Sequence, residues 1–226
     1  MTVFAQLLRR YDHAFNKRPV LTMMLTNLVL GGVADTTAQT VTHVRQRLLH
    51  TSRPLTAPQK LALNIDEKIL EKLPHAGSEL IPTSPASTSF DFARLARFAS
   101  WGFIVAPVQF KWLQFLHRSF PLSKAQGVRP LLKRVALDQL LFAPVGLLGF
   151  FTYVSFAEGG GMEALKKRLD NVYIPAMKAN YLIWPAVQWV NFRFLPLKFQ
   201  MPFAATVGVA WGVYLSLANS SSTVKD

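Results

Sequence analysis

Cysteine is absent from the 226-residue sequence, and acidic residues are few. The absence of cysteine excludes disulfide bonds, thiolate nucleophiles and metal sites with Cys ligands. Only 12 Asp and Glu oppose 25 Lys and Arg, which gives a formal net charge of +13. Such an excess is typical of proteins that bind nucleic acid or anionic lipid, or that present basic loops beside a membrane.

Charge is also scarce within four long apolar runs. Each run has roughly the 20 residues that a helix needs to cross a hydrocarbon core of about 30 Å. Only 16% of the residues are charged, too few to cover a soluble protein that buries four such helices. The pattern predicts an all-α, polytopic membrane bundle. The runs are Pro19 to Val44 with Asp35 as its one charge, Phe98 to Leu116 with Lys111, and the uncharged Gln139 to Ala157 and Phe199 to Ala218.

A fifth apolar segment, Lys178 to Leu197, leaves the number of crossings open between four and five. Basic residues flank both sides of the first run, so the positive-inside rule does not settle the topology. We expect one membrane domain over residues 1–226 with about four transmembrane helices. One of the last two segments is then broken or steeply tilted.

Two further segments are expected to lie on the membrane surface as amphipathic helices. The first eighteen residues, MTVFAQLLRRYDHAFNKR, combine an apolar set with basic residues, and MEALKKRLDNVYI at 162–174 has a similar pattern. Basic residues next to the apolar runs suit anionic lipid head groups. Direct binding of nucleic acid is not expected, because no basic stretch is interleaved with stacking aromatic residues.

Residues 45–91 form an insertion of different composition between the first two runs. Within it, Ala57 to Leu73 has apolar residues at helical spacing, which predicts one amphipathic helix. Pro74 to Asp91 is rich in Pro, Ser and Thr and is expected to be a flexible loop.

Polar residues within the apolar runs are not scattered at random. Successive side chains on an α-helix turn by about 100°, and by this arithmetic the polar residues of three runs share one face with a few Gly and aromatic residues. An Asp that faces lipid at mid-membrane costs roughly 2.5–3.5 kcal/mol, so the stripes are expected to face inward. The three stripes are Asn27, Gly31, Asp35, Gln39 and Thr42; Asp138, Phe142, Gly146, Gly149 and Tyr153; and Asn180, Trp184, Gln188 and Asn191.

This polar interior has two interpretations that the residues leave open. In the first, the polar groups only hold helices together, with Asp35 and Asp138 neutralised by Arg97 or Lys111. In the second, carboxylates and amides line a hydrated path through the bundle and select what passes. Gly146 and Gly149 are expected to let helices approach closely in either case.

Other functional sites are not supported. The five histidines have no metal-ligand spacing, GGGM at 159–162 lacks the Gly-Lys-Ser/Thr ending of a phosphate loop, and no serine nucleophile elbow is present. We therefore expect neither an enzyme nor a cofactor or metal. The expected partners are membrane lipids, anionic ones among them, small solutes and further copies of the chain.

Several stretches resemble the Mpv-seventeen and twenty-two-kilodalton peroxisomal membrane protein family. The resemblance runs through nearly the whole chain and leaves out only the insertion. Its most specific part is the pattern NY-x-x-WPA-x-Q-x-x-NF. The stretches are GGVADTTAQ at 31–39, DFARLARF at 91–98 followed by Gly102, Pro107 and Trp112, LDQLLFAP at 137–144, and NYLIWPAVQWVNFRFLPL at 180–197 followed by Trp211, Tyr214, Leu215 and Ser216.

The resemblance implies a small integral protein of the mitochondrial inner membrane or, as the alternative, of the peroxisomal membrane. It also implies pore-like passage of small solutes, metabolite homeostasis and mitochondrial DNA maintenance; a non-conducting structural or interaction protein is the alternative. Trp184, Pro185 and Pro196 are expected to set the shape or gate. This chain has Gln200 where the family usually has arginine. The polar positions shared with the family are Asp35, Gln39, Arg97, Asp138, Gln139, Asn180, Gln188 and Asn191.

Overall fold

The computed structural model of the chain describes residues 3–50, 90–122 and 127–222. Regular structure in these residues is entirely helical, which confirms the predicted all-α class. In chain order the elements are α1 (Val3–Lys17), α2 (Pro19–His50), α5 (Phe92–Ser119), α6 (Arg129–Leu137), the π-helical turn η2 (Asp138–Phe142), α7 (Ala143–Ala157), α8 (Gly161–Arg168), the π-helical turn η3 (Leu169–Tyr173), α9 (Ile174–Phe194) and α10 (Leu197–Ser222).

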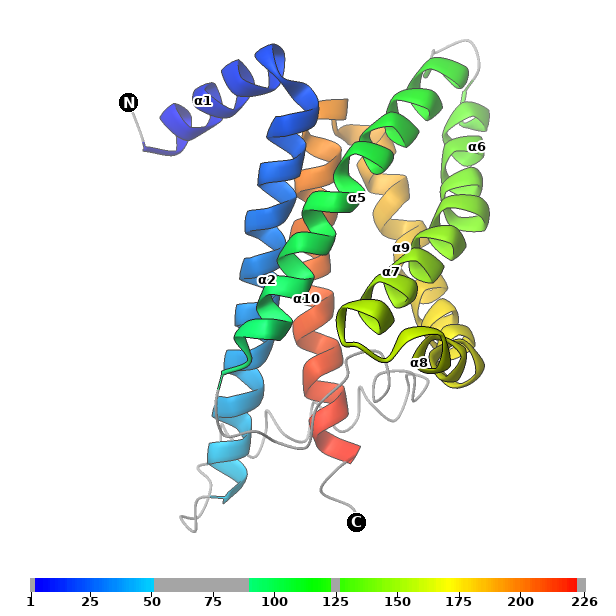
Figure 1. Cartoon of the computed structure of the whole chain (residues 1–226). Helices are drawn as coiled ribbons and strands as arrows, with labels where there is room; N and C mark the ends of the chain where they lie inside the picture. Colours follow the sequence, from blue (N-terminus) through cyan, green and yellow to red (C-terminus); the bar gives the residue numbers. More distant parts are fainter. Residues whose placement is uncertain (1–2, 51–89, 123–126, 223–226) are drawn as a thin grey trace, which may run out of the picture.

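The helices form rods that run between two ends of one bundle (Figure 1). α6, η2 and α7 make one continuous rod, and α8, η3 and α9 make another. We call one end of the bundle the α1 end; it also holds the turns from α5 to α6 and from α9 to α10. The other, the α8 end, holds the start of α5 and the last residues of α10.

Helix α1 lies across the α1 end of the bundle, at a steep angle to α2 (Figure 1). The hydroxyl of Tyr11 donates to the carbonyl oxygen of Lys198 at 2.6 Å, and Lys198 Nζ lies 2.9 Å from the carboxylate of Asp12. Burial, and secondly the neighbouring Asp12, raises the pKa of Tyr11 to about 12, so the hydroxyl keeps its proton at neutral pH. These contacts tie the predicted surface helix to the turn between α9 and α10.

The closest approach between rods is that of α2 to α5. A Cβ built on Gly102 would lie 2.7 Å from the backbone oxygen of Asn27, and one on Gly31 would lie 3.1 Å from the backbone oxygen of Phe98. Small residues at such points allow helices to meet without side chains between them. Toward the α1 end, the gap is filled by a core that includes Met23, Phe110 and Leu113.

The π-helical turn η2 leaves a backbone oxygen that is bonded by a side chain of another helix. The amide of Ala143 donates to the oxygen of Asp138, five residues earlier. The oxygen of Gln139 would take the next such bond from residue 144, but Pro144 has no N–H to donate. The hydroxyl of Tyr181 donates to this freed oxygen at 3.1 Å instead. Each π turn is followed two residues later by a proline, Pro144 or Pro175.

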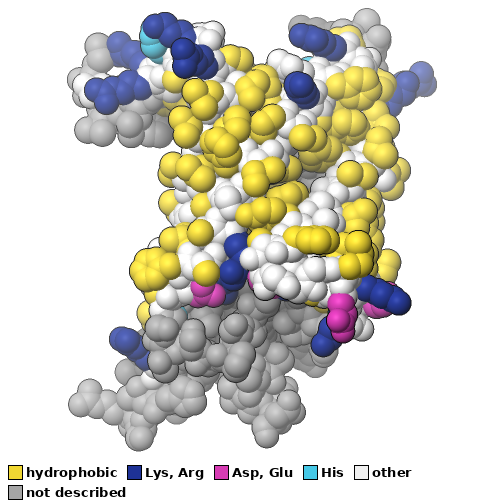
Figure 2. All heavy atoms as spheres, in the orientation of Figure 1, with side chains coloured by type: hydrophobic (Ala, Val, Ile, Leu, Met, Phe, Trp, Pro, Cys, Tyr) yellow, Lys and Arg dark blue, Asp and Glu magenta, His cyan; other side chains and the backbone are white. Residues whose placement is uncertain are grey.

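The distribution of surface side chains suits a membrane. Within the described residues, Pro19–Val44 and Arg129–Ala157 are long and apolar enough to span a bilayer. On the face shown in Figure 2, hydrophobic side chains cover the middle of the bundle. Lys and Arg gather at the α1 end, and basic and acidic side chains mix near the α8 end. The number of crossings stays a prediction; α1 and the last residues of α10 lie at opposite ends of the bundle.

Three expectations of detail differ from the structure. A Cβ on Gly149 would lie 3.3 Å from the ring of Trp101, as expected for close packing, but nothing lies within 4 Å of one on Gly146. The expectation for Gly146 was wrong, because no other helix of the described residues comes within reach of α7 at this position. The 162–174 segment runs without a break into α9, and α2 continues to His50, past the expected start of the insertion. The helix expected at residues 57–73 lies outside the described residues.

Candidate functional site

Two groups of buried polar side chains lie inside the bundle. We call the first the Asp35 centre: Asp35 and Gln39 on α2, with Asp91 and Arg94 at the start of α5. The second, the Asp138 centre, consists of Trp112 on α5, Asp138 and Gln139 on η2, and Gln188 and Asn191 on α9. Asp35, Gln39, Asp138, Gln139, Gln188 and Asn191 are all buried.

The Asp35 centre is an ion pair completed by an amide. The Nε of Arg94 lies 2.8 Å from Oδ1 of Asp35, whose side chain is 0% exposed. The Nε2 of Gln39, one helical turn further along α2, donates to Oδ2 of Asp35 at 2.7 Å. The carboxylate therefore has both a counter-charge and a hydrogen bond. Arg97 and Lys111 were expected as the neutralising groups, and this was wrong, because Arg94 stands one turn closer to the start of α5.

Gln39 also fixes the point where the chain re-enters the bundle. Its Oε1 accepts from the amide of Asp91 at 2.8 Å, while its Nε2 donates to the oxygen of Asp91 at 3.0 Å. Asp91 in turn caps α5, since its Oδ1 accepts from the amide of Arg94 at 2.8 Å. Every hydrogen-bonding group of the Gln39 amide has a partner, as a structural joint requires. This centre behaves as the first interpretation expects.

The Asp138 centre differs because the described residues give its carboxylate no cationic partner within ion-pair distance. Asp138 is 3% exposed and accepts three hydrogen bonds, each from an uncharged group. Oδ1 accepts from the indole Nε1 of Trp112 at 3.1 Å. Oδ2 accepts from Nε2 of Gln188 at 2.7 Å and from Nε2 of Gln139 at 3.0 Å. Lys111, one of the expected neutralising groups, is exposed.

Two amide oxygens of this centre are buried and lack a donor within the described residues: Oε1 of Gln139 and Oδ1 of Asn191. Asn191 uses its Nδ2 to donate to Oε1 of Gln188 at 2.8 Å, so its amide belongs to the same chain of hydrogen bonds. Asp138 and Gln139 are consecutive residues of η2, and both are buried. Buried polar groups normally have a partner, so a charge without a counter-charge beside two unsatisfied oxygens marks this as a specialised place.

The predicted gate residues Trp184, Pro185 and Pro196 make other contacts than the residues of the Asp138 centre. Trp184 points at α10, where its ring lies 4.0 Å from the position of a Cβ on Gly208. Helix α9 continues through Pro185, and α10 begins directly after Pro196. Asn180 is only partly buried, and within the described residues it takes no part in the hydrogen bonds of either centre. The ring that covers Asp138 is that of Trp112, stacked on Phe142 at a centroid distance of 5.3 Å.

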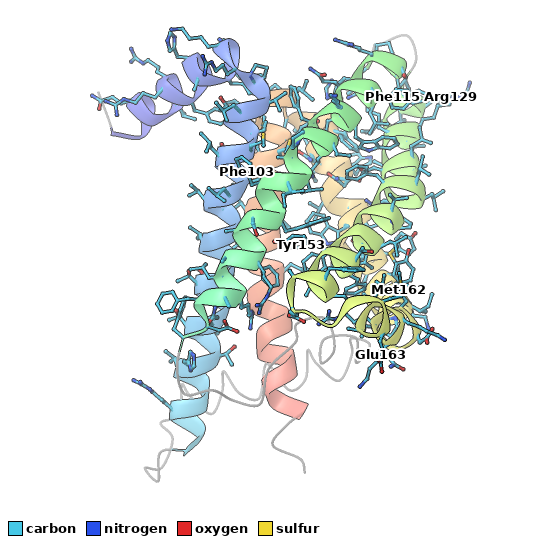
Figure 3. The ribbon with its side chains drawn as sticks, in the orientation of Figure 1. Phe103, Phe115, Arg129, Tyr153, Met162 and Glu163 are labelled. Carbon is cyan, nitrogen blue, oxygen red and sulfur yellow. The ribbon has the colours of Figure 1, made fainter. Side chains whose placement is uncertain are left out.

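Arg97 belongs to a chain of ions at the α8 end instead of to a buried centre. Its Nε lies 3.6 Å from Glu158, which also pairs with Arg168, and Arg168 donates to the hydroxyl of Ser155 at 2.8 Å. These contacts join the start of α5 to the turn between α7 and α8. Tyr153 lies between α5 and α7 (Figure 3), and its hydroxyl is 2.5 Å from that of Ser100 on α5.

Gln200, the residue that departs from the family pattern, is fully buried at the α1 end. Its Nε2 donates to the oxygen of Leu195 at 3.0 Å and lies 2.9 Å from Nε2 of His117. Arg134 is also buried; its Nη1 lies 3.4 Å from the same histidine nitrogen, and its Nε donates to the oxygen of Phe120 at 2.9 Å. Both neighbours of the ring nitrogen are donors, so the imidazole accepts there.

We did not expect Arg94, Trp112 or Arg134 as site residues from the sequence, although Trp112 belongs to the stretches that resemble the family. Arg94 carried one available signal, since Asp91 three residues earlier is a typical N-cap and places the start of the helix beside Gln39. The contact of Trp112 with Asp138 spans two helices, and no spacing within one helix predicts it.

Comparison with known proteins agrees with this architecture. The model of the Mpv17 / PMP22 family matches residues 155–216. The protein sym1 of Schizosaccharomyces pombe is 37% identical over 97% of this chain and 94% of its own length. The chain belongs to the Mpv17/PMP22 family.

Two further relatives differ in how much of this chain they match. Protein SYM1 of Gibberella zeae is 30% identical over 96% of this chain and 99% of its own length. A vacuolar membrane protein of Saccharomyces cerevisiae is 40% identical over 59% of this chain and 43% of its own. No solved structure matches the chain significantly. Together these relatives identify an organellar membrane protein.

Proposed function

We propose that this chain is a channel or passive pore for small solutes, and that the Asp138 centre lies on the path that they take. The observation that carries the proposal is the buried carboxylate of Asp138, which has no cationic partner among the described residues and directly precedes the uncharged run Gln139 to Ala157. A carboxylate that is buried without a counter-charge is costly. Residues that are costly in a membrane usually serve passage of ions or polar solutes.

The contrast between the two centres supports this assignment. The ion pair of Asp35 and Arg94 neutralises its own charge and joins α2 to α5. The Asp138 centre connects three rods and keeps unsatisfied oxygens, although an apolar cluster of the same volume would hold these rods at least as well. Trp112 covers the carboxylate on one side, so the described arrangement is that of a closed path.

We place the protein in the mitochondrial inner membrane, with the peroxisomal membrane as the alternative. The contribution to metabolite homeostasis follows from passage of solutes, while that to mitochondrial DNA maintenance rests on the family resemblance. The basic residues at the α1 end favour contact with anionic lipids. Microscopy of the tagged chain against inner-membrane, peroxisomal and vacuolar markers distinguishes the compartments.

The second candidate is a non-conducting structural or interaction protein of the same membrane. The Asp35 centre favours it, because every atom of the Gln39 amide is satisfied and the joint closes the α8 half of the α2–α5 interface. For such a protein, we propose that the insertion at residues 45–91 recruits partners.

Currents through the full-length protein in planar bilayers test the proposal. Wild type is expected to conduct, and Asp138→Asn to change the unitary conductance at least twofold. The matched control is Asp170→Asn, which makes the same chemical change at an exposed position of the other π turn. Equal currents in all three proteins remove Asp138 from the path, and absence of current in wild type favours the non-conducting candidate.

A further inference from the structure

The Asp138 centre has the composition of a binding site for a small cation. Its buried polar atoms include four oxygens: two of the Asp138 carboxylate, Oε1 of Gln139 and Oδ1 of Asn191. Both amide oxygens are more than nine-tenths buried with their residues and lack a donor within the described part of the chain. We infer that the Asp138 centre binds an alkali-metal cation, Na⁺ or K⁺, through these oxygens.

Charge balance at Asp138 favours a bound cation over a bound water molecule. A buried carboxylate that keeps its charge without a positive partner costs several kcal/mol. A buried water would satisfy the two amide oxygens by donating to them, but it would leave the charge of Asp138 uncompensated. A cation compensates the charge of Asp138 and also gives the two amide oxygens a partner.

The two amide oxygens without a donor favour a metal ion over a proton on Asp138. A proton on Asp138 would neutralise the carboxyl group and supply one donor. It would leave at least one of the two amide oxygens without a partner.

The charge and ligand type select a monovalent ion. One carboxylate supplies a single negative charge, whereas proteins usually hold Ca²⁺ with several carboxylates among six to eight oxygens, and Mg²⁺ with near-ideal octahedral geometry. Softer transition metals need His or Cys ligands. The described residues contain no group of three or more His, Asp or Glu that could hold such a metal.

The amides of Gln139 and Gln188 hold the site in place. Each donates its Nε2 to Oδ2 of Asp138, which fixes both amide groups beside the carboxylate. The inference does not depend on conduction, since a cation could be bound in a conducting or a non-conducting protein.

Thermal unfolding of the purified full-length protein in detergent tests the inference. Tm is measured in NaCl, in KCl and in N-methyl-D-glucamine chloride at matched ionic strength. A cation at ten times its Kd is expected to raise the Tm of wild type by about 3–5 °C relative to the bulky organic cation. Asp138→Asn is expected to lose this difference, while the control Asp170→Asn keeps it.

A second variant and a spectroscopic measurement guard against loss of folding in Asp138→Asn. Gln139→Met keeps the carboxylate and removes one oxygen ligand, so it is expected to weaken the cation dependence at least tenfold in apparent affinity. Infrared difference spectra of wild type on exchange of Na⁺ for N-methyl-D-glucamine are expected to show a shifted carboxylate stretch. The inference is overturned if Tm is the same in all three salts, or if the spectra show a protonated carboxylic acid at neutral pH in every salt.

Discussion

Replacing Arg94 by Gln removes the counter-charge of a carboxylate that has no access to solvent. The side chain of Asp35 is 0% exposed and that of Arg94 is 13% exposed. Removing one partner of a buried pair typically destabilises a protein by about 3–5 kcal/mol, because the other charge is left uncompensated. We therefore expect Arg94→Gln to lower the free energy of unfolding by about 3 kcal/mol or more.

The two partners should not be equivalent. Asp35→Asn leaves a guanidinium that can still reach solvent, so this variant is expected to lose less stability than Arg94→Gln. The double variant should lose less than the sum of the two single changes, since it leaves no unpaired charge. At about 2–4 °C per kcal/mol for a chain of this size, Arg94→Gln should lower Tm by about 6–12 °C.

The assay is thermal unfolding in detergent, followed by tryptophan fluorescence. Arg97→Gln is the matched control, three residues further along α5. Its ion pairs with Asp91 and Glu158 are long, at 3.8 and 3.6 Å, and its side chain is 21% exposed, so about 0–1 kcal/mol is expected. Equal effects of the Arg94 and Arg97 substitutions would refute the reasoning that burial decides the value of the pair.

Two further predictions concern packing and the surface helix. Gly102→Ala places a Cβ 2.7 Å from the backbone oxygen of Asn27, so it should force α2 and α5 apart and lower Tm. Gly146→Ala places a Cβ that meets nothing within 4 Å, so it should raise the free energy of unfolding by up to about 1 kcal/mol. Identical Tm values for the two variants would contradict this prediction. Tyr11→Phe removes the bond to the Lys198 oxygen and should speed tryptic cleavage after Lys17, as followed by gel electrophoresis. An unchanged cleavage rate would show that the bond does not hold α1.

Much of the bundle follows from the sequence because apolar runs, glycines and caps act locally. The run from Pro19 to Val44 reads as one helix, and the glycines at 159–161 end α7 because Gly159 and Gly161 adopt positive φ. Helical spacing also predicted that Asp35 and Gln39 share a buried face. These features depend only on neighbours within a turn or two.

The predictions that failed depend on which residues meet across neighbouring helices. Gly149 and Tyr153 of the stripe that starts at Asp138 lie against α5, but nothing lies within 4 Å of a Cβ on Gly146, and no spacing within α7 predicts this difference. The partner of Asp35 could not be chosen between Arg94 and Arg97 without knowing how far α5 slides along α2.

The difference between the Asp35 centre and the Asp138 centre could not be predicted from the sequence. Sequence arithmetic treated Asp35 and Asp138 alike, since each is a lone acid within or beside an apolar run. Only the contacts show that the first has an arginine and the second has an indole and two amides.

The reversal potential under a KCl gradient tests most directly whether Asp138 faces the path of permeating solutes. A carboxylate on the path attracts cations and repels anions. The account predicts a cation-selective reversal potential for the wild-type protein and a shift toward zero in Asp138→Asn, with Asp170→Asn unchanged. An identical reversal potential in wild type and Asp138→Asn would contradict it.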